Sequence, residues 1–245
     1  MNDSNWLMPE NPWSDDAGRL ICFVYEFWCR ERRPPNLLDI HQATGLAFRD
    51  VRRLYRELKS GFAVSAADES LQLGLLRAPP FSAVPTPVAC YAGERFLSYL
   101  GCPAEATTVG RLPWLEQLEL TIRTYCACCC QPIEYRVKGQ NVLSPQSTLP
   151  LVAFLGSPFD WEDGVGPERV CDDIHFVLDA DHAVRAEQLF LRRGVLASIE
   201  QISKVSNRLA EQRARDPNWG PVVTHGAQAV DFFDSVGVDV SLWRY

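Results

Sequence analysis

The chain has 245 residues, of which 47% are hydrophobic, and this is enough to bury a sizeable core in one large domain or two small ones. The formal net charge of -7 disfavours a general nucleic-acid coating protein, and the apolar content excludes a disordered chain. The densest apolar run, at 21–28, falls well short of the roughly 18 residues that a membrane span needs. The acidic N-terminus lacks the basic start and apolar stretch of a secretory signal, so we expect a cytoplasmic protein with no membrane partner.

The N-terminal part is predicted to be helical. Residues 1–17 are interpreted as an irregular leader, and apolar residues then recur at helical spacing. Helix, short helix, turn and helix is the helix-turn-helix pattern, and a following hairpin would add a wing. We therefore predict a winged-helix-like domain over 18–80. Its expected helices are 18–33, 37–44 and 47–59, and its expected hairpin strands lie around 62–64 and 71–77.

The same region is the only basic part of the chain, with nine Arg or Lys against five Asp or Glu from 18 to 60. A winged helix can read DNA, and arginines on its last helix could contact phosphates. Alternatively, these arginines form the solvated face of an amphipathic helix, which the acidic balance of the whole chain favours. DNA is therefore not an expected partner. The arginines concerned are Arg49, Arg52, Arg53 and Arg56.

A β-rich core packed by helices is predicted over 81–213, so the fold class is α+β. Gly93 is expected to turn a strand pair over 88–101. The C-terminal residues, 214–245, carry several large aromatic side chains and are expected to dock as a tail. The other predicted strands are 118–125, 133–137, 149–155 and 170–178. The predicted helices are 104–117, broken by Gly110 and Pro113, 183–190 and 195–213.

Nine cysteines are many for a reducing compartment, where such thiols are more often buried, metal-binding or catalytic than paired as disulfides. Four of them fall between 126 and 130, in a turn between two predicted strands. Cys126 and Cys129 form a CxxC pair that could bind zinc or another soft metal. No second CxxC or paired histidines follow at a suitable spacing, which favours the alternative of small buried thiols in a β-turn.

Two further cysteines lie beside other reactive side chains. Glu105 follows Cys102 by three residues, so one helical turn would bring a soft nucleophile next to a proton source. In the last predicted strand of the core, Cys171, Asp173 and His175 would share one face, where a nearby imidazolium would favour the thiolate. Alternatively, that face of the strand is only solvated.

Taken together, these motifs resemble the organomercurial (alkylmercury) lyase family over roughly residues 18–213. That family combines an N-terminal winged-helix-like region with a β-rich catalytic core, and its catalytic set is two cysteines and an aspartate. In this chain glutamate stands for that aspartate, Cys130 stands for a glycine, and Asp172 stands for a cysteine beside the second catalytic one. The matching segments are Cys102-Pro103-Ala104-Glu105, Cys126-Ala127-Cys128-Cys129-Cys130-Gln131-Pro132-Ile133 and Val170-Cys171-Asp172-Asp173-Ile174-His175-Phe176.

The resemblance implies protonolytic cleavage of a carbon–mercury bond. Cys102 and Cys171 would hold the metal, and Glu105 would carry a proton from a thiol to carbon. The substrate would be a small organometallic or thiol-reactive compound, Hg(II) would be the bound product, and external thiols would remove it. No organic cofactor is implied. The implied role is detoxification.

Other interpretations remain open on the sequence. With another gap placement, Cys90 and Glu94 occupy the first motif, and a gapless match back from Cys126 puts Glu105 itself at the cysteine position. The protein could also be a thiol-based metal or redox sensor with a winged-helix head, or a relative with the same fold and a different substrate.

Overall fold

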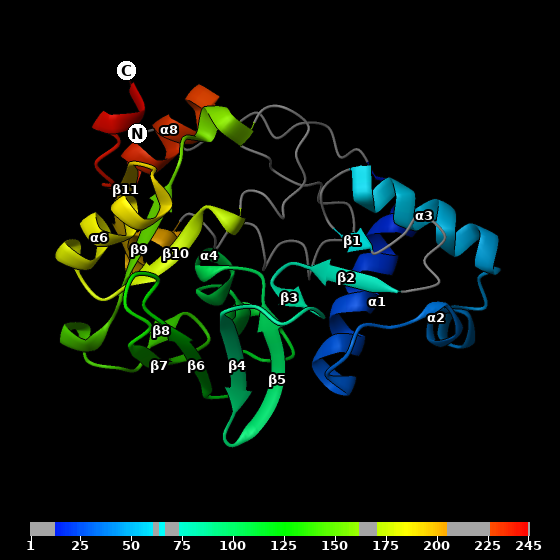
Figure 1. Ribbon diagram of the computed structural model, residues 1–245. Coiled ribbons are helices and arrows are strands. Elements are labelled where there is room, and N and C mark those ends of the chain that lie inside the picture. Colours follow the sequence, from blue (N-terminus) through cyan, green and yellow to red (C-terminus); the bar gives the residue numbers. More distant parts are fainter. Residues whose placement is uncertain (1–12, 61–63, 67–73, 162–170, 205–225, 245) are drawn as a thin grey trace.

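The computed structural model describes residues 13–60, 64–66, 74–161, 171–204 and 226–244. Within these residues the strands form two antiparallel sheets, of eight and three strands, and helices lie around them, so the predicted α+β class is confirmed (Figure 1). The larger sheet contains β1 (Ser65–Ala66), β2 (Leu75–Ala78), β3 (Phe81–Ser82), β4 (Val88–Ala92), β5 (Arg95–Leu100), β6 (Leu120–Tyr125), β7 (Pro132–Lys138) and β8 (Asn141–Val142), in the order β1-β2-β3-β5-β4-β6-β7-β8. The smaller sheet contains β9 (Leu151–Leu155), β10 (Ile174–Val177) and β11 (Gly194–Ser198), in the order β10-β9-β11.

Three helices precede the sheets: α1 (Asp15–Glu31), α2 (Leu37–Thr44) and α3 (Phe48–Ser60). The predicted leader, 1–17, is too long at its C-terminal end, because the Ser14 hydroxyl caps a helix that begins at Asp15. Residues 1–12 lie outside the described part of the chain. Gly45 ends α2 in the left-handed region, at φ 72°, as its position after the last helical residue predicts.

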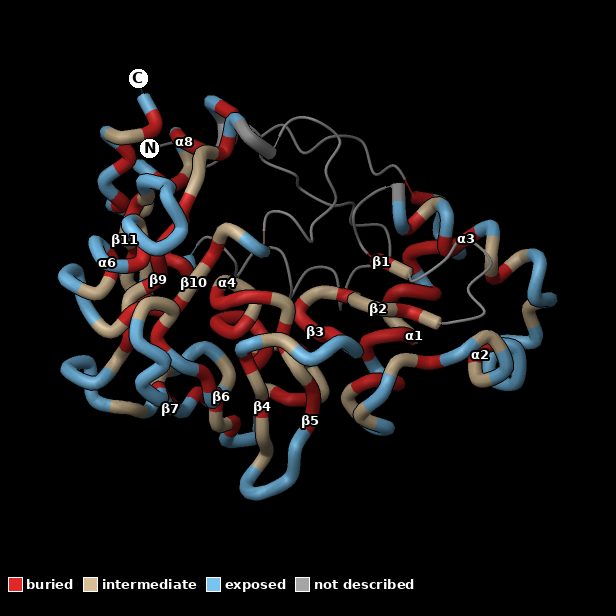
Figure 2. Tube along the Cα trace, viewed as in Figure 1, coloured by how far each residue is buried: buried red, intermediate tan, exposed pale blue. Residues whose placement is uncertain are grey.

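The N-terminal helices and the larger sheet share one buried core (Figure 2). Trp28 of α1 stacks on Phe81 of β3, with ring centroids 5.4 Å apart. β1 pairs with β2, and β2 pairs in turn with β3. Strand pairing therefore continues across the domain boundary predicted at residue 80, although the expected hairpin segments lie partly outside the described residues.

Two predicted helices differ from the structure. The helix expected over 104–117, with breaks at Gly110 and Pro113, is limited to α4 (Pro103–Ala106) and a 3-10 turn at Val109–Arg111, where Gly110 packs against a carbonyl group. A Cβ atom on Gly110 would lie 2.8 Å from the backbone oxygen of Gly139. The helix expected over 195–213 begins as β11 instead, and the described part of the chain is helical there only over 199–204. A Cβ on Gly194 would clash with the backbone oxygen of Phe154, so this glycine lets β11 approach β9.

Helix α6 (Ala180–Phe190) packs against all three strands of the smaller sheet. Within the C-terminal segment, Phe233 and Trp243 pack edge-on against Phe154, while 214–225 lie outside the described residues. No helix in the described residues combines the length and apolar character that a membrane crossing requires. The remaining helical segments are α8 (Gly226–Ser235) and 3-10 turns at Gln146–Thr148, Pro158–Trp161 and Ser241–Arg244.

Candidate functional site

The first candidate residues lie where β5 ends and α4 begins. Cys102 is the N-cap residue of α4 and is buried, and Glu105 lies one helical turn further on. This confirms the helical turn that the sequence predicted between the thiol and the carboxyl group. The Glu105 carboxyl folds back over Gly101, where a Cβ atom would overlap its Oε2 and lie 2.9 Å from its Oε1. Gly101, which the sequence analysis did not single out, therefore leaves the space that the carboxyl occupies.

Cys171 completes a group of three potential metal ligands. The two sulfur atoms and one Glu105 carboxylate oxygen all lie within 4.8 Å of one another. The Cys171 thiol donates a hydrogen bond to Glu105 Oε1 at 3.4 Å. The packing of α4 against β10 brings these residues together, because Cys171 lies just before that strand. The structure thus unites the three residues that the resemblance assigns to catalysis.

The electrostatic environment keeps the Cys171 thiol protonated. Its pKa is raised well above the ordinary value by the hydrogen bond with Cys102, by burial, and by the negative charges of Cys102 and Glu105. The guanidinium group of Arg77, on β2, acts in the opposite direction. Arg77 Nη1 is buried and has no hydrogen-bond partner within the described structure. Arg77 could not be recognised from the sequence, because nothing in a short hairpin strand indicates which distant site its side chain faces.

The predicted polar face of Cys171, Asp173 and His175 is wrong. Strand β10 begins at Ile174, so Cys171 lies in a helical turn outside the strand's alternation. Asp173 forms an ion pair with Arg192. His175 stacks on Phe190 with centroids 4.5 Å apart, and burial lowers its pKa, so it supplies no imidazolium to the thiol at neutral pH.

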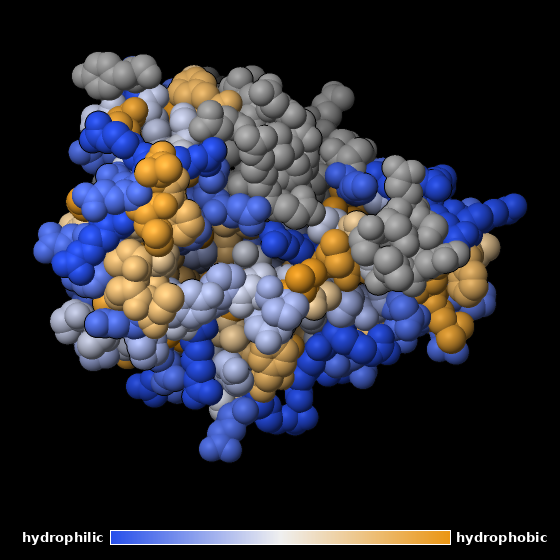
Figure 3. Space-filling model, viewed as in Figure 1, coloured by the Kyte–Doolittle hydropathy of each residue, from blue (hydrophilic) through white to orange (hydrophobic). Residues whose placement is uncertain are grey.

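The alternative first motif lies elsewhere. Cys90 is fully buried in the middle of β4, opposite Ser98 of β5, and burial raises its pKa to about 12. Glu94 is exposed in the turn between β4 and β5, where hydrophilic side chains gather at the bottom of the view in Figure 3. Within the described residues, the group that contains Cys171 includes Cys102 and Glu105 and neither Cys90 nor Glu94.

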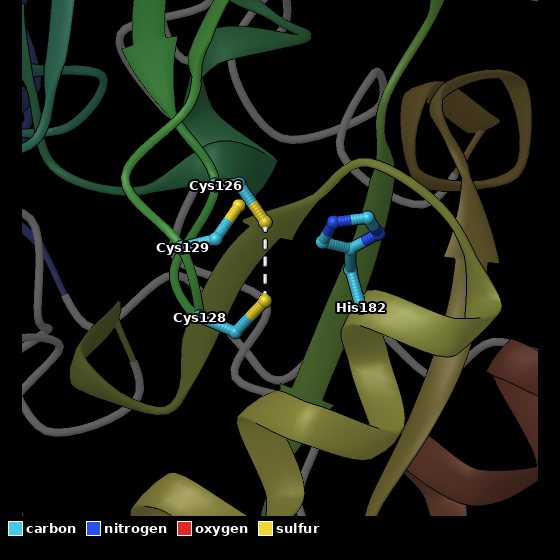
Figure 4. A group of neighbouring side chains, drawn as sticks. All are labelled: Cys126, Cys128, Cys129 and His182. Atoms are coloured by element: carbon cyan, nitrogen blue, oxygen red, sulfur yellow. Dashed lines mark hydrogen bonds between the residues drawn. The ribbon is translucent and has the colours of Figure 1, made fainter.

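The cysteine-rich turn forms a second group, with a ligand that the sequence analysis missed. Sulfur atoms of Cys126, Cys128 and Cys129 and a ring nitrogen of His182 lie within 4.8 Å of one another (Figure 4). The prediction of small buried thiols holds for Cys126 alone, since Cys128 is half-buried and Cys129 and Cys130 are exposed. Cys130, included in the predicted cluster, lies outside this group.

The thiols of this turn differ in their ionisation. Burial opposes ionisation of Cys126, but hydrogen bonds from backbone N–H groups and from the neighbouring thiols outweigh it, and its pKa is lowered. Burial and the interactions with Cys126 and Cys129 raise the pKa of Cys128 to about 12. Cys126 is therefore the first thiol of this pair to become a thiolate, which is the form that binds metals.

Comparison with solved structures gives a match in fold. The structure titled as the mercury-bound form of MerB2 superposes with a TM-score of 0.64 and 16% sequence identity, over 82% of this chain and 93% of that one. At this identity the match shows a shared fold. No protein-family model and no curated protein sequence matches the chain.

Proposed function

We propose that this protein is an organomercurial-lyase-like enzyme that cleaves a carbon–mercury bond by protonolysis at Cys102, Glu105 and Cys171. The observation that carries the proposal is the convergence of these two sulfurs and one carboxylate oxygen within 4.8 Å. Two closely spaced thiolates suit a soft ion such as Hg(II). The fold shared with the mercury-bound form of MerB2 supports the same chemistry.

The reaction begins with metal capture by Cys102. Its thiolate displaces the counter-ion of an R–Hg–X substrate and forms an R–Hg–S bond, with X leaving as an anion. Cys171 is the proton reservoir at this stage, because its raised pKa keeps it as a thiol hydrogen-bonded to Glu105. Arg77 offsets part of the negative charge that accumulates as the second thiol ionises.

Protonolysis then uses the hydrogen bond already present between Cys171 and Glu105. The thiol proton passes to Glu105 as the Cys171 sulfur bonds to mercury, and Glu105 delivers that proton to carbon. The carbon–mercury bond breaks, the hydrocarbon R–H leaves, and Hg(II) remains bound to two cysteine sulfurs. Two external thiol molecules then take the ion and return their protons to the cysteines. We propose that this detoxification occurs in the cytoplasm, where small thiols are abundant.

The test is hydrocarbon release from methylmercury or phenylmercury in the presence of excess small thiol, measured by gas chromatography. Glu105→Gln keeps the size of the side chain but cannot carry the proton, so turnover should fall on the order of 10² to 10⁴. Glu105→Asp should retain activity. Unchanged turnover in Glu105→Gln would remove Glu105 from the mechanism.

Measurements of Hg(II) binding distinguish an enzyme from a protein that only binds the metal. The reduced protein should have an Hg(II) site that is lost in the Cys102→Ser/Cys171→Ser double variant and retained when the four cysteines of the 126–130 turn are serine. Loss in the second variant alone would move the mercury site to the turn. Tight binding by the wild-type protein without hydrocarbon release would instead favour a metal sensor.

A further inference from the structure

We propose that Cys126, Cys128, Cys129 and His182 form a zinc site, separate from the proposed catalytic group, in which Asp179 orients the histidine. The three cysteines lie in the turn between β6 and β7, and His182 lies in the first turn of α6. Figure 4 shows the imidazole ring of His182, on α6, facing the sulfur atoms of the three cysteines. This group and the Cys102 group share no residue.

The turn is held by backbone hydrogen bonds that do not depend on a metal. The Cys126 N–H donates to Gln131 O at 2.9 Å, and the Cys130 N–H donates to Cys126 O at 2.9 Å. The Ala127 N–H donates to Phe176 O of β10, also at 2.9 Å, which fixes the turn against the smaller sheet. The thiols are therefore presented on a preformed loop.

The spacing of the sulfurs fits a tetrahedral ion. Cys126 Sγ and Cys128 Sγ are 3.6 Å apart. Two zinc–sulfur bonds of about 2.3 Å at a tetrahedral angle place their sulfurs about 3.8 Å apart. Cys129 and His182 complete four ligands within 4.8 Å, the number that a closed structural zinc site uses.

His182 is oriented for coordination by the residue that begins its helix. Asp179 is the N-cap of α6, and its Oδ1 accepts the His182 backbone N–H at 2.9 Å. The same oxygen lies 2.8 Å from His182 Nδ1, so a protonated Nδ1 donates to it and Nε2 is left for the metal. A carboxylate that receives the second ring nitrogen is the usual support of a zinc-binding histidine.

The number and type of ligands at this site match those of a structural zinc site. Mercury is satisfied by two soft thiolates, whereas imidazole together with thiolates in a four-ligand set suits zinc. Because all four positions are protein side chains, the site leaves no position for substrate and has a structural role. The ion would tie the β6–β7 turn of the larger sheet to α6, which covers the smaller sheet.

The experiment measures zinc in the full chain, expressed without a histidine tag in zinc-supplemented medium and dialysed with a reductant. We expect about one zinc per chain by mass spectrometry, and tetrahedral cobalt spectra with sulfur-to-cobalt charge transfer after exchange. His182→Ala and Cys129→Ser should lose the ion. Cys130→Ser is the matched control, an exposed cysteine outside the group, and should keep it.

Two further variants test the role of Asp179 and the independence of zinc binding from the Cys102 group. Asp179→Ser preserves a good N-cap but cannot reach the imidazole, so zinc affinity should fall about 10- to 100-fold in a chelator competition. Cys102→Ser/Cys171→Ser should retain zinc, which keeps this result independent of the lyase proposal. A reduced wild-type protein with neither zinc nor a tetrahedral cobalt spectrum would overturn the site. So would equal zinc loss in Cys130→Ser and Cys129→Ser.

Discussion

The thiol of Cys171 donates a hydrogen bond to the Glu105 carboxylate at 3.4 Å, although 66 residues separate them in the sequence. This contact joins the helical turn before β10 to helix α4, and it supplies a direct path for a proton from sulfur to carboxylate. The nearby Cys102 sulfur gives the same group a second soft ligand.

Gly101→Ala should displace the Glu105 carboxyl with little cost to the fold. A Cβ at position 101 would overlap Oε2, which is the end of a flexible side chain and can rotate away. Hydrocarbon release should fall toward the level of Glu105→Gln, while Hg(II) binding and the unfolding temperature stay close to wild type. The Gly101→Ala/Glu105→Gln double variant should be hardly worse than Glu105→Gln alone, because both changes remove the same function. Wild-type turnover in Gly101→Ala would refute this role of the glycine.

Alkylation of Cys171 by iodoacetamide should be slow at neutral pH and should accelerate about tenfold per pH unit, because the thiolate reacts and its pKa is raised. Arg77→Met removes a charge that lowers this pKa, so alkylation at a fixed alkaline pH should slow. Glu105→Gln removes a charge that raises the pKa, so alkylation should quicken. Peptide mass spectrometry gives the rates, with the exposed Cys130 as reference. If the alkylation rate of Cys171 changed in the same direction in both variants, the opposite effects assigned to Arg77 and Glu105 would be contradicted.

Cys130→Gly should stabilise the cysteine-rich turn. Cys130 has φ 57°, in the left-handed region that costs a residue with a Cβ atom on the order of 1 kcal/mol. The free energy of unfolding in urea should therefore rise by about 1 kcal/mol or slightly less, since glycine also adds entropy to the unfolded chain. Cys130→Ala keeps the Cβ and should give no such gain. A destabilised Cys130→Gly protein, or one that loses zinc, would show that the Cys130 thiol has a role of its own.

Local patterns in the sequence predicted much of the fold. The spacing of apolar residues correctly predicted α1 and α3, and alternation predicted β6 and β7. The strand pair turning at Gly93 also follows from local chemistry, because its φ of 59° suits glycine. The segment Gly194–Ser198 was predicted as helix and is a strand. A short apolar run fits both structures, and pairing with β9 decides between them.

Local sequence predicts only part of the candidate site as well. The sequence by itself determined that Cys102 and Glu105 lie together, because one turn of α4 spans them. It also identified Cys126 and Cys129 as a candidate metal-binding pair, beside the alternative of small buried thiols. Only the tertiary structure decided that Cys102 and Glu105, rather than Cys90 and Glu94, lie beside Cys171, and that His182 joins the second group. Helical and turn spacing is set by local backbone geometry, whereas contacts between distant segments depend on how α4, β10 and α6 pack, which no local pattern encodes.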